Sequence, residues 1–306
     1  MKRNSHSSSV PIAAVERDTG LSKDTLRVWE RRYGFPSPER GPSGERLYPR
    51  DQLEKLRLLR RLLDAGHRPG KIIGLPAAQL QALASSVPAA AAASNAAGEP
   101  ELAALLELVK AHQVDALRRA LSLSARRHGL ARFVIERVAP MNRLVGDAWA
   151  SGGLELFEEH LYTESIQFVL RKSIAAIPTN PHGPLVLLTT LPPEPHGLGL
   201  LMAEAIATLA GARCVSLGVQ TPVPDVVRAA TAHRADVVAL SFTGCVRPNA
   251  VIASLGELRA RLPAQIAIWA GGSSPALRRS PPQVRVITDL ADLAPAVRRL
   301  RDGAPE

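Results

Sequence analysis

Short apolar runs alternate with helical patterns along the last third of the chain. Five runs of strand length, bounded by turn residues, predict strands at 185–190, 214–217, 237–241, 266–270 and 284–287. The segments between and after them predict helices at 200–209, 224–232, 249–261 and 289–300. This order predicts a doubly wound, Rossmann-like α/β domain over residues 184–306. Ligands of such sheets bind at the carboxyl ends of the strands, so we expect chemistry in the loops after Thr190, Ser241 and Ala270.

Residues 101–180 carry apolar stripes at helical spacing and little strand character. The stripes begin near Leu102, Val114, Phe133 and Leu161, and short connections separate them. The segment therefore predicts a four-helix bundle. Residues 84–100, which are rich in Ala, Ser and Pro, predict a linker in front of it, and residues 1–9 predict a disordered polar tail.

The pattern of residues 10–83 predicts a winged helix-turn-helix. A helix beginning at Ile12 stops at Thr19-Gly20, and Ser22 can cap a second helix that runs from Lys23 to Tyr33. A Gly- and Pro-rich hairpin over 36–48 follows, and then an amphipathic helix over 51–63. In such modules the second helix enters the major groove of DNA, and the hairpin, or wing, grips backbone phosphates.

Composition and charge narrow the class of protein. The 306 residues predict two or three domains, and two cysteines exclude a disulfide framework or a cysteine zinc cluster. A polar N-terminus without an apolar signal segment, and the absence of any apolar stretch of membrane-spanning length, predict a cytoplasmic protein without a membrane partner. Residues 1–76 hold 16 Lys and Arg against 9 Asp and Glu, which is most of the net charge of +10. A polyanion should bind there.

The cationic residues of this first segment are the candidate contacts to double-stranded DNA. Arginine can pair bidentately with guanine or hold phosphate. The candidates are Lys23, Arg27 and Arg31 on the second helix and Arg40, Arg46 and Tyr48 on the wing, whereas Trp29 is expected in the core. The sequences LRVWERRYG and ERGPSGERLY, at this separation, resemble the winged helix-turn-helix of the MerR superfamily. The cysteines of MerR metal sensors have no counterpart here, so metal sensing is not expected.

Three loops of the α/β domain carry a second constellation. After the first strand, Glu194 precedes His196 by two residues and Gly199 follows by three; a ligating histidine usually donates its other ring nitrogen to a carboxylate. Ser241 and Thr243 follow the third strand, and Gly271 and Gly272 follow the fourth. Together they resemble the Asp-x-His-x-x-Gly, Ser-x-Thr and Gly-Gly motifs of the cobalamin-binding fold, with Glu194 in place of the commoner Asp. The resemblance implies that His196 is the lower axial ligand of cobalt and that the other six bind the cofactor.

The bundle carries a matching motif. Trp149, nine intervening residues and then Glu159-His160 resemble the motif of the helical cap of CarH-type photoreceptor regulators. The resemblance implies that these three residues lie at the upper face of adenosylcobalamin. In light-sensing members a histidine that captures cobalt follows the Trp, but here the residue is Ala150, which cannot ligate a metal. A light response would then need another upper ligand, such as water or His160.

The sequence thus predicts a transcription regulator rather than an enzyme. Resemblance implies a repressor that binds adenosylcobalamin or a related cobalamin, covers promoter DNA as a homodimer or homotetramer, and loosens when the adenosyl group is lost. One alternative is a regulator that is independent of cobalamin or binds another tetrapyrrole. Another is a corrinoid carrier that hands methyl groups to a methyltransferase, although this leaves the DNA-binding segment without a purpose.

Overall fold

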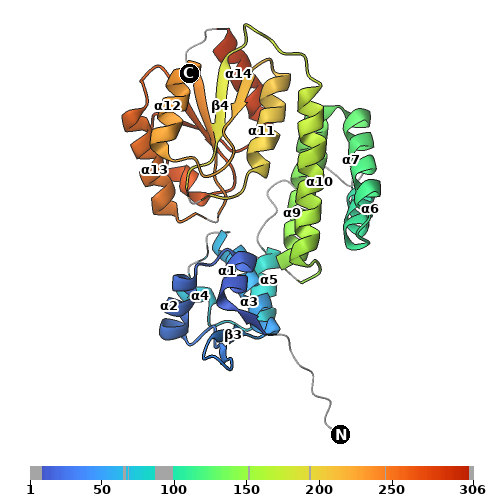
Figure 1. Cartoon of the computed structure of the whole chain (residues 1–306), viewed down its shortest axis with the longest axis vertical. Helices are drawn as coiled ribbons and strands as arrows, with labels where there is room; N and C mark the ends of the chain where they lie inside the picture. Colours follow the sequence, from blue (N-terminus) through green and yellow to red (C-terminus); the bar gives the residue numbers. More distant parts are fainter. Residues whose placement is uncertain are drawn as a thin grey trace. The chain divides into compact units, whose positions relative to one another are not determined.

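The structure is a computed structural model that describes residues 9–64, 67, 69–86, 99–150, 152–192, 194–244 and 246–302 (Figure 1). It divides into two compact units. The first joins residues 1–94 to 145–156, and the second joins residues 95–144 to 157–306. Most of the predicted disordered N-terminal tail and most of the predicted linker lie outside the described residues.

The first unit begins with the predicted helix-turn-helix. Helix α1 (Ile12–Thr19) ends at Gly20, whose φ of 66° lies in the left-handed region that glycine adopts without strain. Helix α2 (Lys23–Tyr33) starts at the predicted cap, where the Ser22 hydroxyl accepts a hydrogen bond from the backbone N–H of Thr25 at 3.2 Å. Gly20 and Ser22, from which the sequence predicts the tight turn, therefore end the first helix and begin the second.

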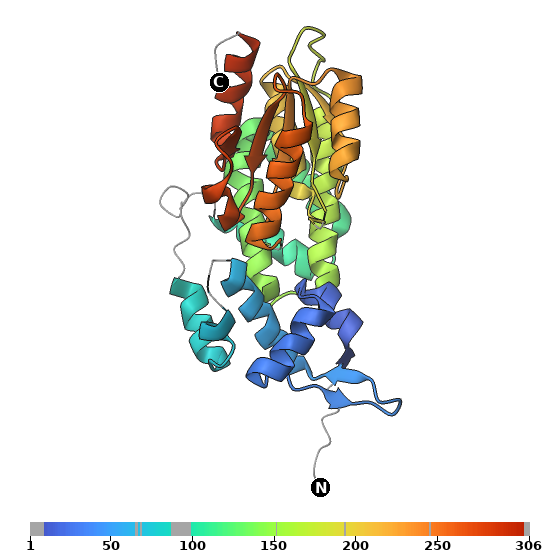
Figure 2. The same ribbon diagram turned by 90° about the vertical axis from the view of Figure 1, so that its left-hand side faces the viewer.

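A three-stranded antiparallel sheet in the order β1-β3-β2 forms the wing. Strand β1 is Val10–Pro11, and the hairpin, visible in Figure 2, consists of β2 (Glu39–Arg40) and β3 (Arg46–Tyr48). Helices α3 (Arg50–Asp64), α4 (Pro69–Ile72) and α5 (Ala77–Ser86) complete the module. Trp29 is buried in the core with leucines of α3, which confirms its predicted structural place.

The bundle helices follow the predicted stripes. They are α6 (Glu99–Lys110), α7 (Val114–His128), a run made of α8 (Leu130–Phe133), the π-helical η1 (Val134–Val138) and α9 (Ala139–Ala150), and finally α10 (Leu156–Ala175). The end of α9 and the start of α10 belong to the first compact unit. Within the described ranges, no helix is both long and apolar enough to cross a membrane.

The α/β domain contains a parallel sheet in the order β5-β4-β6-β7-β8. The strands are β4 (Leu185–Thr189), β5 (Arg213–Ser216), β6 (Val237–Ser241), β7 (Ala267–Gly271) and β8 (Val284–Ile287). Helices α11 (Leu198–Leu209) and α14 (Leu293–Arg301) cover one face, and α12 (Val223–His233) and α13 (Pro248–Arg261) cover the other (Figure 1). Short 3-10 helices, η2 (Pro275–Arg279) and η3 (Leu290–Asp292), precede β8 and α14. The predicted doubly wound fold is confirmed.

Candidate functional site

The strand order places the predicted loops together. The chain moves from β4 to β5 on one side and returns to β6 on the other, so the topology switches direction between β4 and β6. A crevice opens at the carboxyl edge of a doubly wound sheet at such a point. The loop with Glu194 and His196 leaves β4 there, and Ser241 and Thr243 leave β6 beside it.

The Glu194 carboxylate is the centre of this edge. Its side chain is fully buried, and it accepts four hydrogen bonds. His196 gives two, from ring Nδ1 at 2.6 Å and from its backbone N–H at 3.1 Å. Thr243 gives the others, from its backbone N–H at 2.7 Å and its hydroxyl at 2.8 Å. Burial alone raises the pKa of the Glu194 carboxyl, but the hydrogen bonds from His196 and Thr243 outweigh it and hold the pKa below its ordinary value.

This anion decides the chemistry of His196. An ionised carboxylate can only accept, so Nδ1 of the imidazole must carry the proton, and the lone pair of a neutral ring then lies on Nε2. A carboxylate partner of this kind fixes the orientation of a metal-binding histidine and raises its basicity. The side chain of His196 is 53% exposed. The predicted dyad of Glu194 and His196 is therefore built as a lower-ligand histidine requires.

The glycines at this edge also allow the protein's own chain segments to pack closely together. A Cβ at Gly199 would lie 3.1 Å from the hydroxyl of Ser241, which is buried. At Gly271 a Cβ would lie 2.6 Å from the carbonyl oxygen of Ile287. At Gly272, where φ is 109°, it would lie 2.2 Å from the carbonyl oxygen of Phe242. The close approach of neighbouring backbone thus explains why Gly271 and Gly272, which the motif assigns to cofactor binding, are glycines.

Thr243 has a role that the sequence interpretation missed. Its motif position predicts a hydrogen bond to a bound cofactor, yet its hydroxyl and its backbone N–H both donate to Glu194, 49 residues away in the sequence. Only the strand order brings these two residues together, so no local signal in the sequence could have revealed the contact.

The residues of the predicted cap lie at the junction of α9 and α10. Glu159 accepts hydrogen bonds from the Thr163 hydroxyl at 2.8 Å, and one of its oxygens lies 2.7 Å from Nδ1 of His160. The His160 side chain is 66% exposed. Trp149 lies near the end of α9 in the first unit, where its indole Nε1 is buried and has no hydrogen-bond partner among the described residues. Ala150 is the last residue of that helix.

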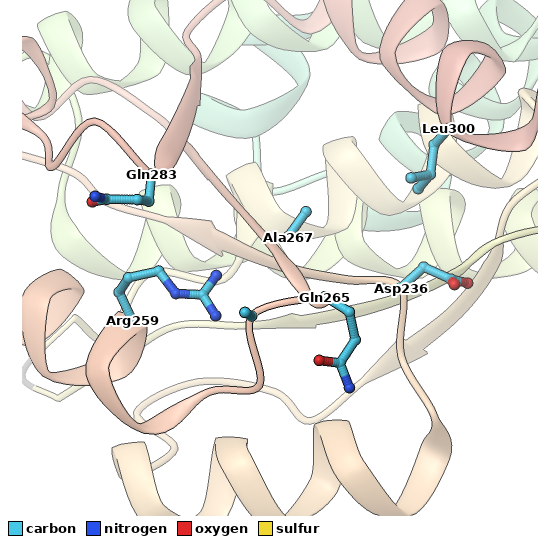
Figure 3. Close-up of a pocket in the computed structure, with 7 residues that line it drawn as sticks. Asp236, Arg259, Gln265, Ala267, Gln283 and Leu300 are labelled. Atoms are coloured by element: carbon cyan, nitrogen blue, oxygen red, sulfur yellow. The ribbon is translucent and has the colours of Figure 1, made fainter. Parts of the chain in front are cut away.

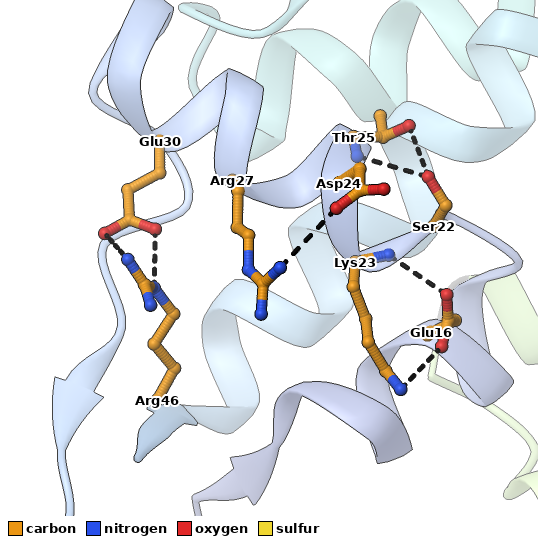
Figure 4. A network of polar contacts seen from close by, with 8 residues as sticks. All are labelled: Glu16, Ser22, Lys23, Asp24, Thr25, Arg27, Glu30 and Arg46. Carbon is orange, nitrogen blue, oxygen red and sulfur yellow. Dashed lines mark hydrogen bonds and ion pairs between the residues drawn. The ribbon is translucent and has the colours of Figure 1, made fainter. Parts of the chain in front are cut away.

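Two of the candidate cations on α2 pair with nearby carboxylates. Lys23 lies 3.3 Å from Glu16, and Arg27 lies 3.5 Å from Asp24 (Figure 4). Arg31 is exposed on the same helix. Exposed ion pairs are weak, because water solvates both partners and salt screens them. These cations can therefore exchange their carboxylates for DNA phosphates.

The wing residues behave differently from one another. Arg40 donates to the backbone carbonyl of Gly44 at 2.9 Å within the hairpin. Arg46 points back to α2, where its Nε donates to the Glu30 carboxylate at 2.8 Å, and both side chains are only 28% exposed (Figure 4). Tyr48 is fully buried in the core of the module. The prediction that Tyr48 contacts DNA is wrong, because its ring is packed in the core and presents no surface to a partner.

A pocket of about 440 Å³ lies at the opposite, amino end of the sheet (Figure 3). The two charged residues of its lining are already used by the fold. Asp236 accepts the backbone N–H of Leu185 at 2.7 Å, and the Arg259 guanidinium donates to the carbonyls of Leu262, Pro263 and Ile266. The pocket is separate from the Glu194–His196 edge.

Comparison with known proteins agrees with this geometry. The MerR HTH family regulatory protein model matches residues 10–79, and the B12 binding domain model matches residues 184–285. The HTH-type transcriptional repressors CarH and CarA of Myxococcus xanthus are each 30% identical to this chain. The alignments cover 83% and 86% of it, and 86% of each relative. The monomethylamine corrinoid protein of Methanosarcina barkeri covers 66% of the chain at 14% identity with a TM-score of 0.53, which shows a shared fold.

A helix-turn-helix module joined to a sheet with a carboxylate-held histidine at its switch point defines a DNA-binding regulator with a ligand domain. The chain belongs to the family of MerR-type transcription regulators that carry a B12-binding domain. It is therefore a cobalamin-binding, DNA-binding regulator.

Proposed function

We propose that this regulator is a repressor whose cobalamin is adenosylcobalamin, with His196 as the lower axial ligand of cobalt. The observation that carries the proposal is the Glu194–His196 dyad at the switch point, with the ring nitrogen 2.6 Å from a buried carboxylate. Thr243 holds that carboxylate from the adjacent loop. The printed names of CarH and CarA, both repressors, support the direction of control.

The remaining motif residues divide between the two sides of the cofactor. Gly199, Ser241, Gly271 and Gly272 would lie along its nucleotide tail, as the motif resemblance implies. Trp149, Glu159 and His160 would lie at its upper face, with Glu159 held in place by the Thr163 hydroxyl. When bound, adenosylcobalamin supplies a cobalt–carbon bond that light can break. The protein's own residues would hold and orient the cofactor.

The DNA-binding face acts through Lys23, Arg27, Arg31 and Arg40 on the phosphates and base edges of double-stranded promoter DNA. Arg46 adds to this face indirectly, because its pair with Glu30 ties the wing to α2. Loaded chains would associate as a homodimer or homotetramer, which places two or more such modules on one promoter.

Ala150 favours a second candidate, in which the protein senses the level of cobalamin rather than light. An alanine cannot replace the upper ligand of cobalt, so capture by a histidine directly after Trp149 is not available. A light response would then rest on water or on His160. The alternative of a methyl carrier gives no role to the MerR module.

The test is an absorption spectrum of the full-length protein loaded with adenosylcobalamin in the dark and then illuminated, with the mass measured by size-exclusion chromatography. We expect cobalamin bands that remain with the protein and a larger mass than that of the cofactor-free chain. A mass that changes on illumination supports light sensing. A mass that stays the same on illumination supports sensing of the cobalamin level. Absence of cobalamin bands contradicts the proposal.

His196→Ala tests the ligand assignment. The variant should lose most of its cobalamin affinity and stay folded, because the side chain is 53% exposed and Thr243 still donates two hydrogen bonds to Glu194. His182→Ala, at an exposed histidine before β4, is the control and should bind as the wild type does. Unchanged affinity in His196→Ala would show that His196 is not the ligand.

A further inference from the structure

One face of α3 contacts the segment that carries Trp149. Arg50, Glu54 and Arg57 recur at helical spacing, so their side chains lie on the same side of the helix. The Arg57 guanidinium lies 5.3 Å from the centre of the Trp149 ring. Arg50 forms an ion pair with Glu155, and a Cβ at Gly152 would lie 3.8 Å from the Glu54 carboxylate. All of these residues belong to the first compact unit.

Arg57 also connects this face to the helix-turn-helix. Its side chain is only 6% exposed, and it donates two hydrogen bonds of 3.0 Å to the Asp18 carboxylate. Asp18 lies in the last turn of α1, next to the Thr19-Gly20 turn. Trp149, the Arg57 guanidinium and Asp18 therefore form a continuous contact from α9 to the turn that sets the angle of α2.

The chemistry of the contact makes it specific. A planar guanidinium held by a carboxylate has one fixed orientation, and its charge is attracted to the face of an indole ring. The buried indole Nε1 of Trp149 has no hydrogen-bond partner among the described residues, so the recorded contact uses the ring face. A lysine ammonium at this position could still pair with Asp18 and be attracted to the ring, but it lacks the planar guanidinium that stacks on the indole face in a fixed orientation.

We propose that Arg57 is a positioning residue that holds Trp149 on the DNA-binding module and thereby couples cofactor binding to DNA binding. The proposal rests on the proposed function, in which Trp149 lies at the upper face of adenosylcobalamin. A ligand that contacts Trp149 changes the free energy of its contact with Arg57. By thermodynamic linkage, the affinity for DNA then depends on the cofactor, and the affinity for the cofactor depends on DNA.

The first experiment measures this coupling in the full-length protein. A DNA duplex is selected from a random pool by the wild-type protein, and its dissociation constant is measured in the dark with and without adenosylcobalamin. The ratio of the two constants is the coupling factor. Arg57→Lys should bring this factor about two- to thirtyfold closer to one, because the stacking contact is lost while the charge remains. Arg119→Lys, at an exposed arginine of α7, should leave the factor unchanged.

A purely structural role for Arg57 gives a different result. In that case Arg57→Lys would weaken DNA binding to the same extent with and without the cofactor, and the coupling factor would stay at its wild-type value. That outcome overturns the proposal, as does a wild-type coupling factor of one. If the wild-type protein takes up no cobalamin, the proposed function itself has failed, and the absorption spectrum reveals this separately.

The second experiment tests the contact without any cofactor. The double variant R50C/E155C, in a chain with Cys214→Ser and Cys245→Ser, should be joined within the chain by a homobifunctional maleimide reagent, visible as faster migration on a denaturing gel. A linker is needed because the ion pair joins the ends of two long side chains, whereas a direct disulfide requires much closer backbones. R50C alone should show no such band. If the double variant fails to cross-link, the α3 face does not hold the Trp149 segment, and the proposed coupling route is wrong whatever the spectrum shows.

Discussion

The polar side chains at the carboxyl edge of the sheet bind one another, whereas those on α2 lie in solvent and pair with neighbours in sequence or on the adjacent helix. Glu194 is fully buried and accepts four hydrogen bonds, while Lys23 and Arg27 are about half exposed. A cofactor site gains from side chains that are already oriented, because little order must be created on binding. A DNA-binding face gains from cations that can exchange partners, because its affinity comes largely from phosphates.

Asp18 and Asp24 test the role of burial within the helix-turn-helix. Asp18→Ala leaves the buried Arg57 charge unpaired, so it should lower the free energy of unfolding by roughly 3–5 kcal/mol. Asp24→Ala removes an exposed pair and should cost at most about 1 kcal/mol. Urea denaturation followed by circular dichroism measures both. Equal effects would mean that burial does not separate these two pairs.

Gly272 tests the packing of the sheet edge. Gly272→Ala should destabilise the α/β domain by about 2–4 kcal/mol, because φ is 109° and the new Cβ meets the Phe242 carbonyl at 2.2 Å. Gly146→Ala is the control, since this helical glycine has open space around it and should gain about 0.5–1 kcal/mol. The measurement is thermal denaturation. A stable Gly272→Ala variant would show that the edge can move apart.

Variants of Arg46 and Glu30 separate positioning from direct contact at the DNA face. Arg46→Ala should weaken binding to all sequences alike and lower the salt slope by about one unit, since the wing loses both a cation and its tie to Glu30. Glu30→Gln keeps the arginine but weakens the tie. If the tie matters, this variant should also weaken binding, although it removes a negative charge. Stronger binding by Glu30→Gln would assign Arg46 to direct phosphate contact alone.

The smallest expected effect concerns a carboxylate in the bundle, away from both sites. Burial raises the pKa of the Glu101 carboxyl. Hydrogen bonds from Ser124 and Arg137, together with the positive charge of Arg137, outweigh this effect and hold the pKa below the ordinary 4.5. A depressed pKa in the folded state means that the stabilisation is present above 4.5 and is lost as the pH falls through the folded value. The melting temperature of wild type should exceed that of Glu101→Gln at pH 6, and the gap should shrink towards pH 4. A constant gap would contradict the depressed pKa.

Much of the local structure could be predicted because its causes are local. The five strands and the capping of α2 by Ser22 follow from apolar runs and a hydroxyl at the right position. The contact between Glu194 and His196 was also predictable, since the two residues lie two positions apart in one loop.

Only the tertiary structure decided how residues distant in sequence would pair. The side-by-side placement of β4 and β6 brings Thr243 to Glu194, and packing of the wing on α2 brings Arg46 to Glu30 and turns Tyr48 inward. The pairing of Asp18 with Arg57 likewise joins residues 39 positions apart. The sequence by itself determined which elements form and which chemical groups this protein carries. Long-range packing determined their partners, because burial and strand order depend on contacts that no local pattern encodes.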